Sequence, residues 1–122
     1  MNDRGYAIEL DVKFGYLELI DVPHLVAESL EKWSNQTLCR VNDCVVRLGV
    51  LEGEFHWHRH KDEDEFFFVL QGKLLIDLKD KTIILELHQG FAVPKGVVHR
   101  TRAAERTVVL MVEGSGVNPT GD

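Results

Sequence analysis

The apolar residues of this 122-residue chain recur at about every second position in a series of short runs between Thr37 and Glu113. Such alternation places successive side chains on opposite faces of a β-strand. Short alternating runs joined by turn residues are typical of a β-sandwich or barrel. The expected strands are residues 37–41, 44–51, 55–60, 65–70, 73–78, 82–87, 91–93 and 107–113.

The first 36 residues have a different pattern. Residues 8–12 and 16–20 alternate or nearly alternate, which predicts two short strands around a turn at residues 13–15. Asp21 is then a plausible helix N-cap, and Pro23 falls in the first helical turn, where its missing N–H costs nothing. Apolar residues follow at helical spacing as far as Trp33, so we expect one helix here.

The expected architecture is therefore a single all-β domain with one short N-terminal helix. A chain of this length is large enough for one hydrophobic core and too small for two. Residues 1–36 form the N-terminal strands and helix, residues 37–113 form the barrel, and residues 114–122 have the composition of a loop. We expect this C-terminal tail to lie over the surface.

Composition excludes several classes of partner. The formal net charge of −6 argues against nucleic acid, because phosphate binding depends on clustered Lys and Arg. No stretch is apolar for long enough to cross a membrane or to read as a signal peptide, so we expect a soluble cytoplasmic protein. Cys39 and Cys44 flank a turn at Asn42 and Asp43 and would be diagonal neighbours on paired strands, beyond disulfide reach. We expect both thiols to be reduced core residues.

Three histidines stand at alternate positions before the strand at residues 65–70. His56, His58 and His60 would share one face of a strand, with neighbouring rings about 6.6 Å apart along it. The turn after His60 brings Glu65 back beside them, and imidazole together with carboxylate suits a divalent transition metal. Alternation alone does not decide which of these histidines bind the ion.

Two motifs resemble those of the cupin superfamily. His58, His60, Glu65 and Gly72 match a His-x-His, Glu and Gly pattern, and Pro94, Gly96 and His99 match a Pro-x-Gly-x-x-His turn. The resemblance implies a double-stranded β-helix, or jelly-roll barrel, and it selects the metal ligands. The implied ligands are His58, His60, Glu65 and His99.

The resemblance implies one divalent transition metal per chain, either Fe, Mn, Zn or Ni, and a small-molecule ligand. Cupins include dioxygenases, isomerases, decarboxylases and sensors, so the chain is expected to be either a metal-dependent enzyme or a non-catalytic, metal-stabilised binding module. The sequence does not decide between them. No pair of helices that would bind DNA is present.

The expected ligand pocket adjoins the ion. His56, two positions before His58, is either an acid/base in the pocket or a core histidine. Arg47 is either an outer-face surface charge or a clamp for a substrate carboxylate or phosphate. Phe67 points inward in the same phase as Glu65 and is a candidate pocket residue.

Strand alternation also predicts an apolar outer face that carries Trp57, Phe66, Phe68 and Leu70. Large apolar groups gathered on an outer face usually mark an interface. The cover is expected to be either a second subunit or the N-terminal segment, and a closed homodimer through Trp57, Phe66 and Phe68 fits best.

Overall fold

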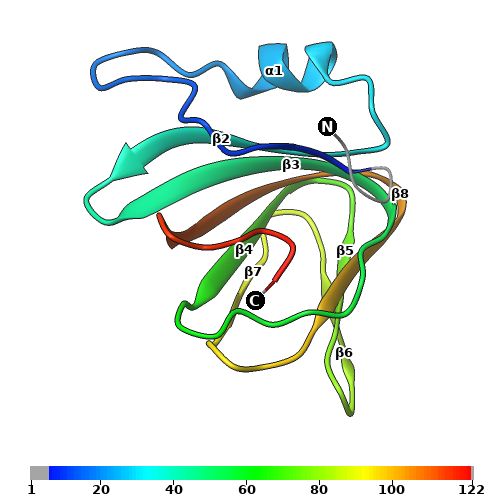
Figure 1. Ribbon diagram of the computed structural model, residues 1–122. Coiled ribbons are helices and arrows are strands. Elements are labelled where there is room, and N and C mark those ends of the chain that lie inside the picture. Colours follow the sequence, from blue (N-terminus) through cyan, green and yellow to red (C-terminus); the bar gives the residue numbers. More distant parts are fainter. Residues whose placement is uncertain (1–5, 122) are drawn as a thin grey trace.

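The computed structural model describes residues 6–121 and confirms an all-β barrel with one short helix (Figure 1). The helix lies on the outside of the barrel, above its upper layer of strands. In chain order the elements are β1 (Ala7–Glu9), α1 (Val22–Glu28), β2 (Trp33–Val41), β3 (Cys44–Glu54), β4 (Glu65–Gln71), β5 (Leu74–Asp77), β6 (Thr82–Leu85), β7 (Gly90–Val93) and β8 (Arg100–Gly114).

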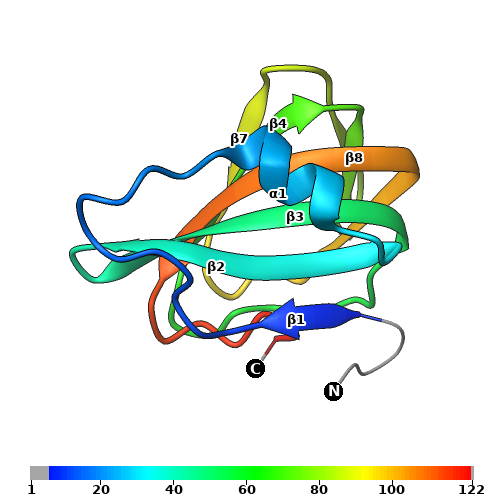
Figure 2. The ribbon, with the colours of Figure 1, turned by 90° about the horizontal axis from the view of Figure 1, so that it is seen from above.

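The long strand β8 connects the two halves of the barrel. One edge of β8 pairs with β3 along most of its length. Its other edge pairs with β5 near the start, at residues 100–102, and with β4 towards the end, at residues 108–113. Because one strand serves both halves, the sheet curls around a single interior (Figures 1 and 2).

The barrel interior has the inward phase that alternation predicts. Phe67, Val69 and Thr101 are buried, and Val97 is partly buried against the same core. The opposite phase of β4 faces outward, with Phe66 exposed and Leu70 partly buried. The predicted inward and outward faces of β4 are therefore confirmed, because a shift by one residue would exchange them.

A second core lies between the outer face of the sheet and the N-terminal segment. Leu25 of α1 is buried with residues of β2, β3 and β8, and Leu70 joins the same cluster. The N-cap prediction is confirmed, because Asp21 Oδ1 accepts a hydrogen bond from the backbone N–H of His24 at 3.2 Å. Part of the outer apolar face is thus covered by the chain's own N-terminal segment. Among the described residues no helix has the length and apolar character needed to span a membrane.

The helix is shorter than the periodicity predicts. It ends at Glu28, and Trp33 instead begins β2 and is buried inside the barrel. Trp33 therefore fits the helical spacing only by coincidence, because its ring packs in the barrel core and does not contact the apolar face of the helix.

Two predicted strands are wrong. Residues 16–20 form a turn and irregular backbone, with Leu17 in the left-handed region at φ 67°, and the earlier strand is confined to Ala7–Glu9. Residues 55–60 are also irregular, apart from one bridge at His58. A strand needs a regular ladder of backbone hydrogen bonds, and residues 55–60 bond to residues 96–101 only at Phe55, His58 and His60.

The C-terminal tail does not lie over the surface as predicted. Val117 and Pro119 are buried, and the segment folds back across the opening of the barrel (Figure 1). The cysteine register is as predicted, with Val41 opposite Cys44 and Cys39 opposite Val46. Both thiols are free, but Cys44 is exposed and so is not a core residue.

Candidate metal centre

Four backbone-directed hydrogen bonds hold the two predicted motif segments together. The N–H of His58 donates to the carbonyl of His99 at 2.9 Å, and the N–H of His99 donates to the carbonyl of His58 at 2.8 Å. Gly96 N–H donates to the His60 carbonyl at 2.8 Å, and Lys95 N–H donates to Asp64 Oδ1 at 2.9 Å. The irregular segment after β3 and the turn before β8 thus form one unit.

This unit brings together the four residues that the resemblance implies as ligands. His58, His60, Glu65 and His99 each offer one ligand atom, and these atoms all lie within 4.8 Å of one another. Glu65 begins β4 and His99 directly precedes β8, so paired strands anchor one side of the group. Such a group could hold a metal ion.

The structure explains why the motif has a glycine at position 72. It adopts φ +85°, and a Cβ there would lie 2.5 Å from Thr107 Oγ1 and 3.0 Å from the carbonyl oxygen of Arg106. Only glycine fits this turn without strain. The turn joins β4 to β5, and its tightness keeps β4 in register.

Backbone carbonyls set the tautomers of two of the histidines. His58 Nδ1 lies 3.0 Å from the carbonyl of His56, and His99 Nδ1 lies 3.0 Å from the carbonyl of Val97. A carbonyl only accepts, so each Nδ1 carries the proton, and in a neutral ring Nε2 is left with a bare lone pair. His60 is buried, and neither of its ring nitrogens has an aligned hydrogen-bond partner.

Two of the Nε2 atoms lie against one carboxylate oxygen. Glu65 Oε1 lies 3.2 Å from His99 Nε2 and 3.3 Å from His60 Nε2. An ionised carboxylate oxygen and a bare imidazole nitrogen are both acceptors, so they repel each other unless a proton or a cation lies between them. The donor set and its orphaned nitrogens therefore fit a metal ion.

Electrostatics favour the protonation states that a metal needs. Burial, and next the proximity of His99, lowers the pKa of His58 from 6.5 to about 4, so this ring is neutral at pH 7. Burial raises the pKa of Glu65, but interactions with His60 and His99 outweigh it and hold that pKa well below its usual range. Neutral imidazole and ionised carboxylate are the ligand forms of these groups.

A buried ion pair lies next to Glu65. Arg47 Nε lies 2.9 Å from Glu113 Oε2, and both side chains are almost fully buried. Glu113 stands opposite Glu65 across β8 and β4. Burial, followed by the proximity of Glu65, raises the pKa of Glu113, while Arg47 acts in the opposite direction without reversing the shift.

The surface interpretation of Arg47 is therefore wrong, because the guanidinium lies inside the barrel and contacts Glu113. Sequence reasoning missed Glu113 altogether. Its signal was present, since Glu113 shares the alternation phase of Met111 and Val109, both of which are buried. A carboxylate in an inward phase is a candidate for a functional group.

His56 is not a member of the four-residue group. Its Nε2 lies 2.6 Å from the carbonyl of Thr120, and its ring stacks on Phe55 with centroids 4.4 Å apart. His56 thus holds the C-terminal tail against the barrel opening. The exposed turn acids Asp62 and Asp64 also lie outside the group, as expected.

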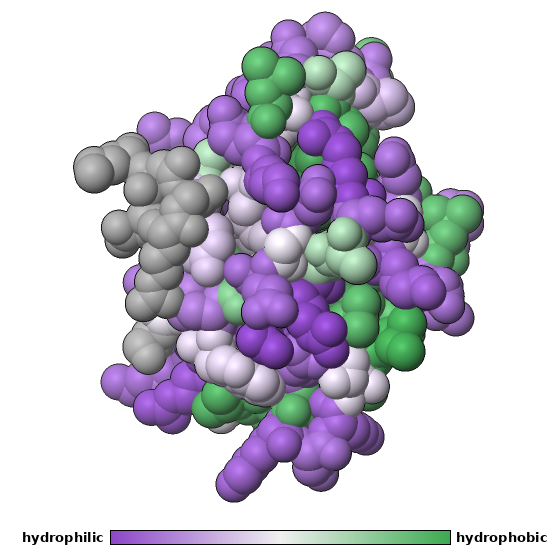
Figure 3. All heavy atoms as spheres, turned by 90° about the vertical axis from the view of Figure 1, so that its right-hand side faces the viewer, coloured by the Kyte–Doolittle hydropathy of each residue, from purple (hydrophilic) through white to green (hydrophobic). Residues whose placement is uncertain are grey.

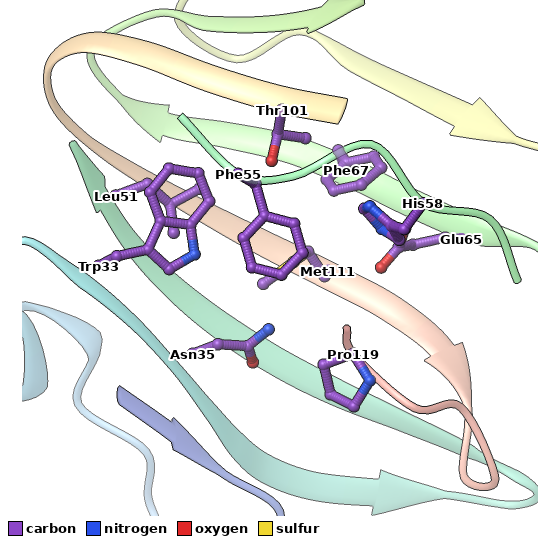
Figure 4. Close-up of a pocket in the computed structure, with 10 residues that line it drawn as sticks. All are labelled: Trp33, Asn35, Leu51, Phe55, His58, Glu65, Phe67, Thr101, Met111 and Pro119. Atoms are coloured by element: carbon purple, nitrogen blue, oxygen red, sulfur yellow. The ribbon is translucent and has the colours of Figure 1, made fainter. Parts of the chain in front are cut away.

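A cavity opens beside the candidate ligands (Figure 4). Ten residues line it, and His58 and Glu65 form one end. Phe67 lines the wall, as predicted for a pocket residue, whereas Arg47 and His56 are not among the lining residues. Asn35 of β2 and Pro119 of the tail also line it, and sequence reasoning identified neither.

Comparison with known proteins identifies the family of the chain. The cupin domain family model matches residues 44–113. An uncharacterised protein of Bacillus subtilis, YdbB, is 53% identical over 87 residues, which are 70% of this chain and 77% of that protein. A cupin-2 domain protein of Shewanella frigidimarina superposes with a TM-score of 0.75 at 33% identity, covering 79% of this chain and 94% of that one. Protein NMB1881 of Neisseria meningitidis superposes with a TM-score of 0.72 at 24% identity, covering 80% of this chain and 99% of that one.

The family model matches more than half of the chain, the Bacillus subtilis protein is a close relative, and the fold is the expected barrel. This chain therefore belongs to the cupin domain family.

Proposed function

We propose that this protein binds one divalent transition metal through His58, His60, Glu65 and His99, and holds a small molecule beside it. The observation that carries the proposal is the orientation of the rings. Two backbone carbonyls fix protons on Nδ1 of His58 and His99, which leaves both Nε2 atoms free within a group that also contains an ionised carboxylate. A group with surplus acceptors is arranged for a cation.

Imidazole and carboxylate ligands suit Fe, Mn, Zn or Ni. Such an ion supplies Lewis acidity to a bound oxygen group, lowers the pKa of a bound water, or binds dioxygen. The chain's own residues supply the remaining features. His58 and Glu65 present the centre to the cavity, and apolar walls limit water.

The first candidate activity is a metal-dependent oxidoreductase or isomerase acting on a small molecule. The alternative is a non-catalytic binding or sensor module. The cavity supports both, since both require a ligand beside the ion. His56, the sequence candidate for proton transfer, is already bonded to the carbonyl of Thr120, which favours binding without turnover.

The test begins with elemental analysis of protein purified without a chelator, followed by loading with each of the four metals. Dioxygen uptake and substrate conversion are then screened for each loaded form. We expect near-stoichiometric metal in every preparation. If no metal binds at any loading, the proposed function is wrong. Turnover that disappears in His99→Ala would select the enzyme, and tight ligand binding without turnover would select the sensor.

We also propose a homodimer. Val112 of β8 stands opposite Phe66 of β4 on the outer face, and each is 38% exposed, while Trp57 is 46% exposed. The side of the molecule drawn in Figure 3 is mainly hydrophilic, with separated apolar patches. Symmetric dimers bury such self-complementary faces.

Sedimentation at micromolar concentration should give about twice the chain mass for the natural sequence. Phe66→Lys should give the mass of one chain, because a buried charge would oppose association. Ile84→Lys is the matched control, since Ile84 is 53% exposed on β6 and lies outside this face. A monomeric natural protein would exclude the dimer.

A further inference from the structure

The C-terminal tail, residues 115–121, crosses the barrel opening and lies against the candidate metal centre (Figure 1). Pro119 of the tail lines the same cavity as His58 and Glu65. A Cβ at Gly121 would lie 2.6 Å from His58 Cβ, so the tail backbone passes in contact with a candidate ligand. The tail thus covers the four-residue group on this side of the barrel.

The covered cavity is too small for an organic ligand. The space within it is about 20 Å³, and a single water molecule needs about 10 to 15 Å³. Ligand pockets that bury an organic molecule are many times larger. If a small molecule binds beside the ion, as the proposed function on which this inference rests requires, part of the cavity wall moves to admit it.

The tail is the part of the wall that lies outside the barrel framework. The other lining residues lie on β2, β3, β4 and β8 or in the segment that is bridged to His99. Within the described residues, one hydrogen bond ties residues 118–121 to that framework, from His56 Nε2 to the carbonyl of Thr120 at 2.6 Å. A segment with so few anchors opens locally at a low cost in free energy.

Residues 118–121 form a turn that is closed by its own hydrogen bonds. Gly121 N–H donates to the Asn118 carbonyl at 2.9 Å, and the Thr120 hydroxyl donates to Asn118 Oδ1 at 2.9 Å. The root of the tail is fixed separately, because Val117 is buried and its N–H donates to the Gly114 carbonyl at 3.1 Å. The turn can therefore swing away from the opening as a unit, with its root in place.

His56 is positioned to hold this turn closed. Its ring stacks on Phe55 with centroids 4.4 Å apart and on Tyr6 at 5.8 Å, so residues other than the tail fix its position. A carbonyl only accepts, so Nε2 carries the proton, and in a neutral ring Nδ1 is a bare lone pair, which is buried with no partner. The closed state thus retains an unsatisfied buried atom, which offsets part of what the hydrogen bond contributes.

We propose that residues 118–121 are a lid over the candidate metal centre, that the hydrogen bond from His56 to Thr120 is its latch, and that a small molecule reaches the ion when the latch opens. His56 is a positioning residue, because it controls access to the ion through the tail and is not a ligand. Since a small molecule binds only the open form, its apparent affinity is reduced by the fraction of molecules that are open.

The test uses cobalt-loaded protein and azide, a linear anion that is larger than a water molecule. Divalent cobalt suits the same ligands, and its absorption reports its coordination. His56→Phe keeps an aromatic ring against Phe55 and removes only the donor. We expect the rate constant for azide association to rise about fivefold to tenfold, as for the loss of one hydrogen bond. The rate constant for azide dissociation should not change, because the lid is open in the bound form of both chains.

Three further variants make the test specific. His24→Phe is the matched control, since this ring is exposed on α1, and both rate constants should stay unchanged. His56→Gln should restore most of the slow association, because its amide N–H can donate to the Thr120 carbonyl. Val117→Ser serves as a second opening variant if His56→Phe prevents folding, because it weakens the buried root of the lid.

Hydrogen exchange of the metal-free protein gives a readout that needs no ion. The peptide containing residues 115–121 should exchange faster in His56→Phe than in the natural chain, and His24→Phe should show no difference. Equal azide association in the natural chain and His56→Phe, or equal exchange of their tails, would each overturn the lid. Cobalt content is measured in every sample. A natural chain that binds no cobalt would instead refute the proposed function, while the exchange result still decides the lid.

Discussion

His58 and His99 are joined by a pair of reciprocal backbone hydrogen bonds, and their rings lie 4.4 Å apart between centroids. The two residues are 41 positions apart in the sequence, and each belongs to a different motif. The bridge makes the geometry of one motif depend on the other. The bridge also explains why the two motif segments, although irregular, direct their side chains toward the same four-residue group.

The ligand assignment predicts a specific pattern of metal loss. His60→Ala and His99→Ala should each lose bound metal, because an ion left with too few protein donors dissociates. His56→Ala should retain about one ion per chain, since its ring contacts Thr120 and not the group. Elemental analysis after identical loading measures this.

The exposed His24 provides the matched control, and His24→Ala should behave like the natural chain. If His56→Ala strips the metal while His60→Ala keeps it, the site is shifted by two residues and Glu65 is not a ligand.

Metal removal should lower thermal stability. An ion that binds only the folded state adds about 2.7 kcal/mol to the free energy of unfolding at a hundredfold excess over Kd. Calorimetry of chelated and reloaded protein should therefore show a melting temperature that is lower by several degrees without metal. His99→Ala should show no such difference. An equal melting temperature for both forms of the natural chain would mean that the ion is peripheral.

The metal-free protein should become less stable as the pH falls from 6.5 towards 4. The pKa of His58 is about 4 in the folded state and 6.5 in the unfolded chain, so over this window only the unfolded chain binds the proton. The loss from this residue is on the order of 3 kcal/mol. Urea unfolding at pH 7 and pH 4.5 measures it. His58→Gln should show a smaller difference, and an unchanged difference would show that His58 is not responsible.

Removal of Glu113 should cost more stability than removal of Arg47. A buried guanidinium cannot lose its charge, whereas the Glu113 carboxyl can take up a proton. Glu113→Leu should thus lower the free energy of unfolding by about 3 to 5 kcal/mol, and Arg47→Met by less. Adding Arg47→Met to Glu113→Leu should restore part of the loss. A double variant less stable than both single variants would contradict this account.

Gly121 should be required for the tail to close the barrel. Its φ is +99°, and a Cβ there would lie 2.6 Å from His58 Cβ. Gly121→Ala should release residues 115–121 and make them more sensitive to a protease. Gly116→Ala is the control, because a Cβ at Gly116 meets no atom within 4 Å. Equal cleavage of both variants would show that the tail does not depend on this contact.

Motif spacing and strand alternation determined much of this protein from the sequence alone. The barrel, the inward phase of Phe67 and the four-residue group could be predicted, because a repeat of two residues fixes faces and the two motifs mark their turns. The cysteine register followed from a single turn for the same reason. These are local properties of the chain.

Contacts between segments distant in the sequence decided the other features of the fold and the site. Residues 55–60 alternate like a strand, but they bond to residues 96–101 only at separate points and form a single bridge, at His58. Arg47 and Glu113 meet only when β3 and β8 pair, and Asn35 faces the cavity only because β2 begins at Trp33. The tail becomes a wall of the pocket when Thr120 reaches His56, which lies 64 residues earlier. Alternation assigns a side chain to a face, but which groups share that face depends on contacts between distant segments, and no local pattern encodes them.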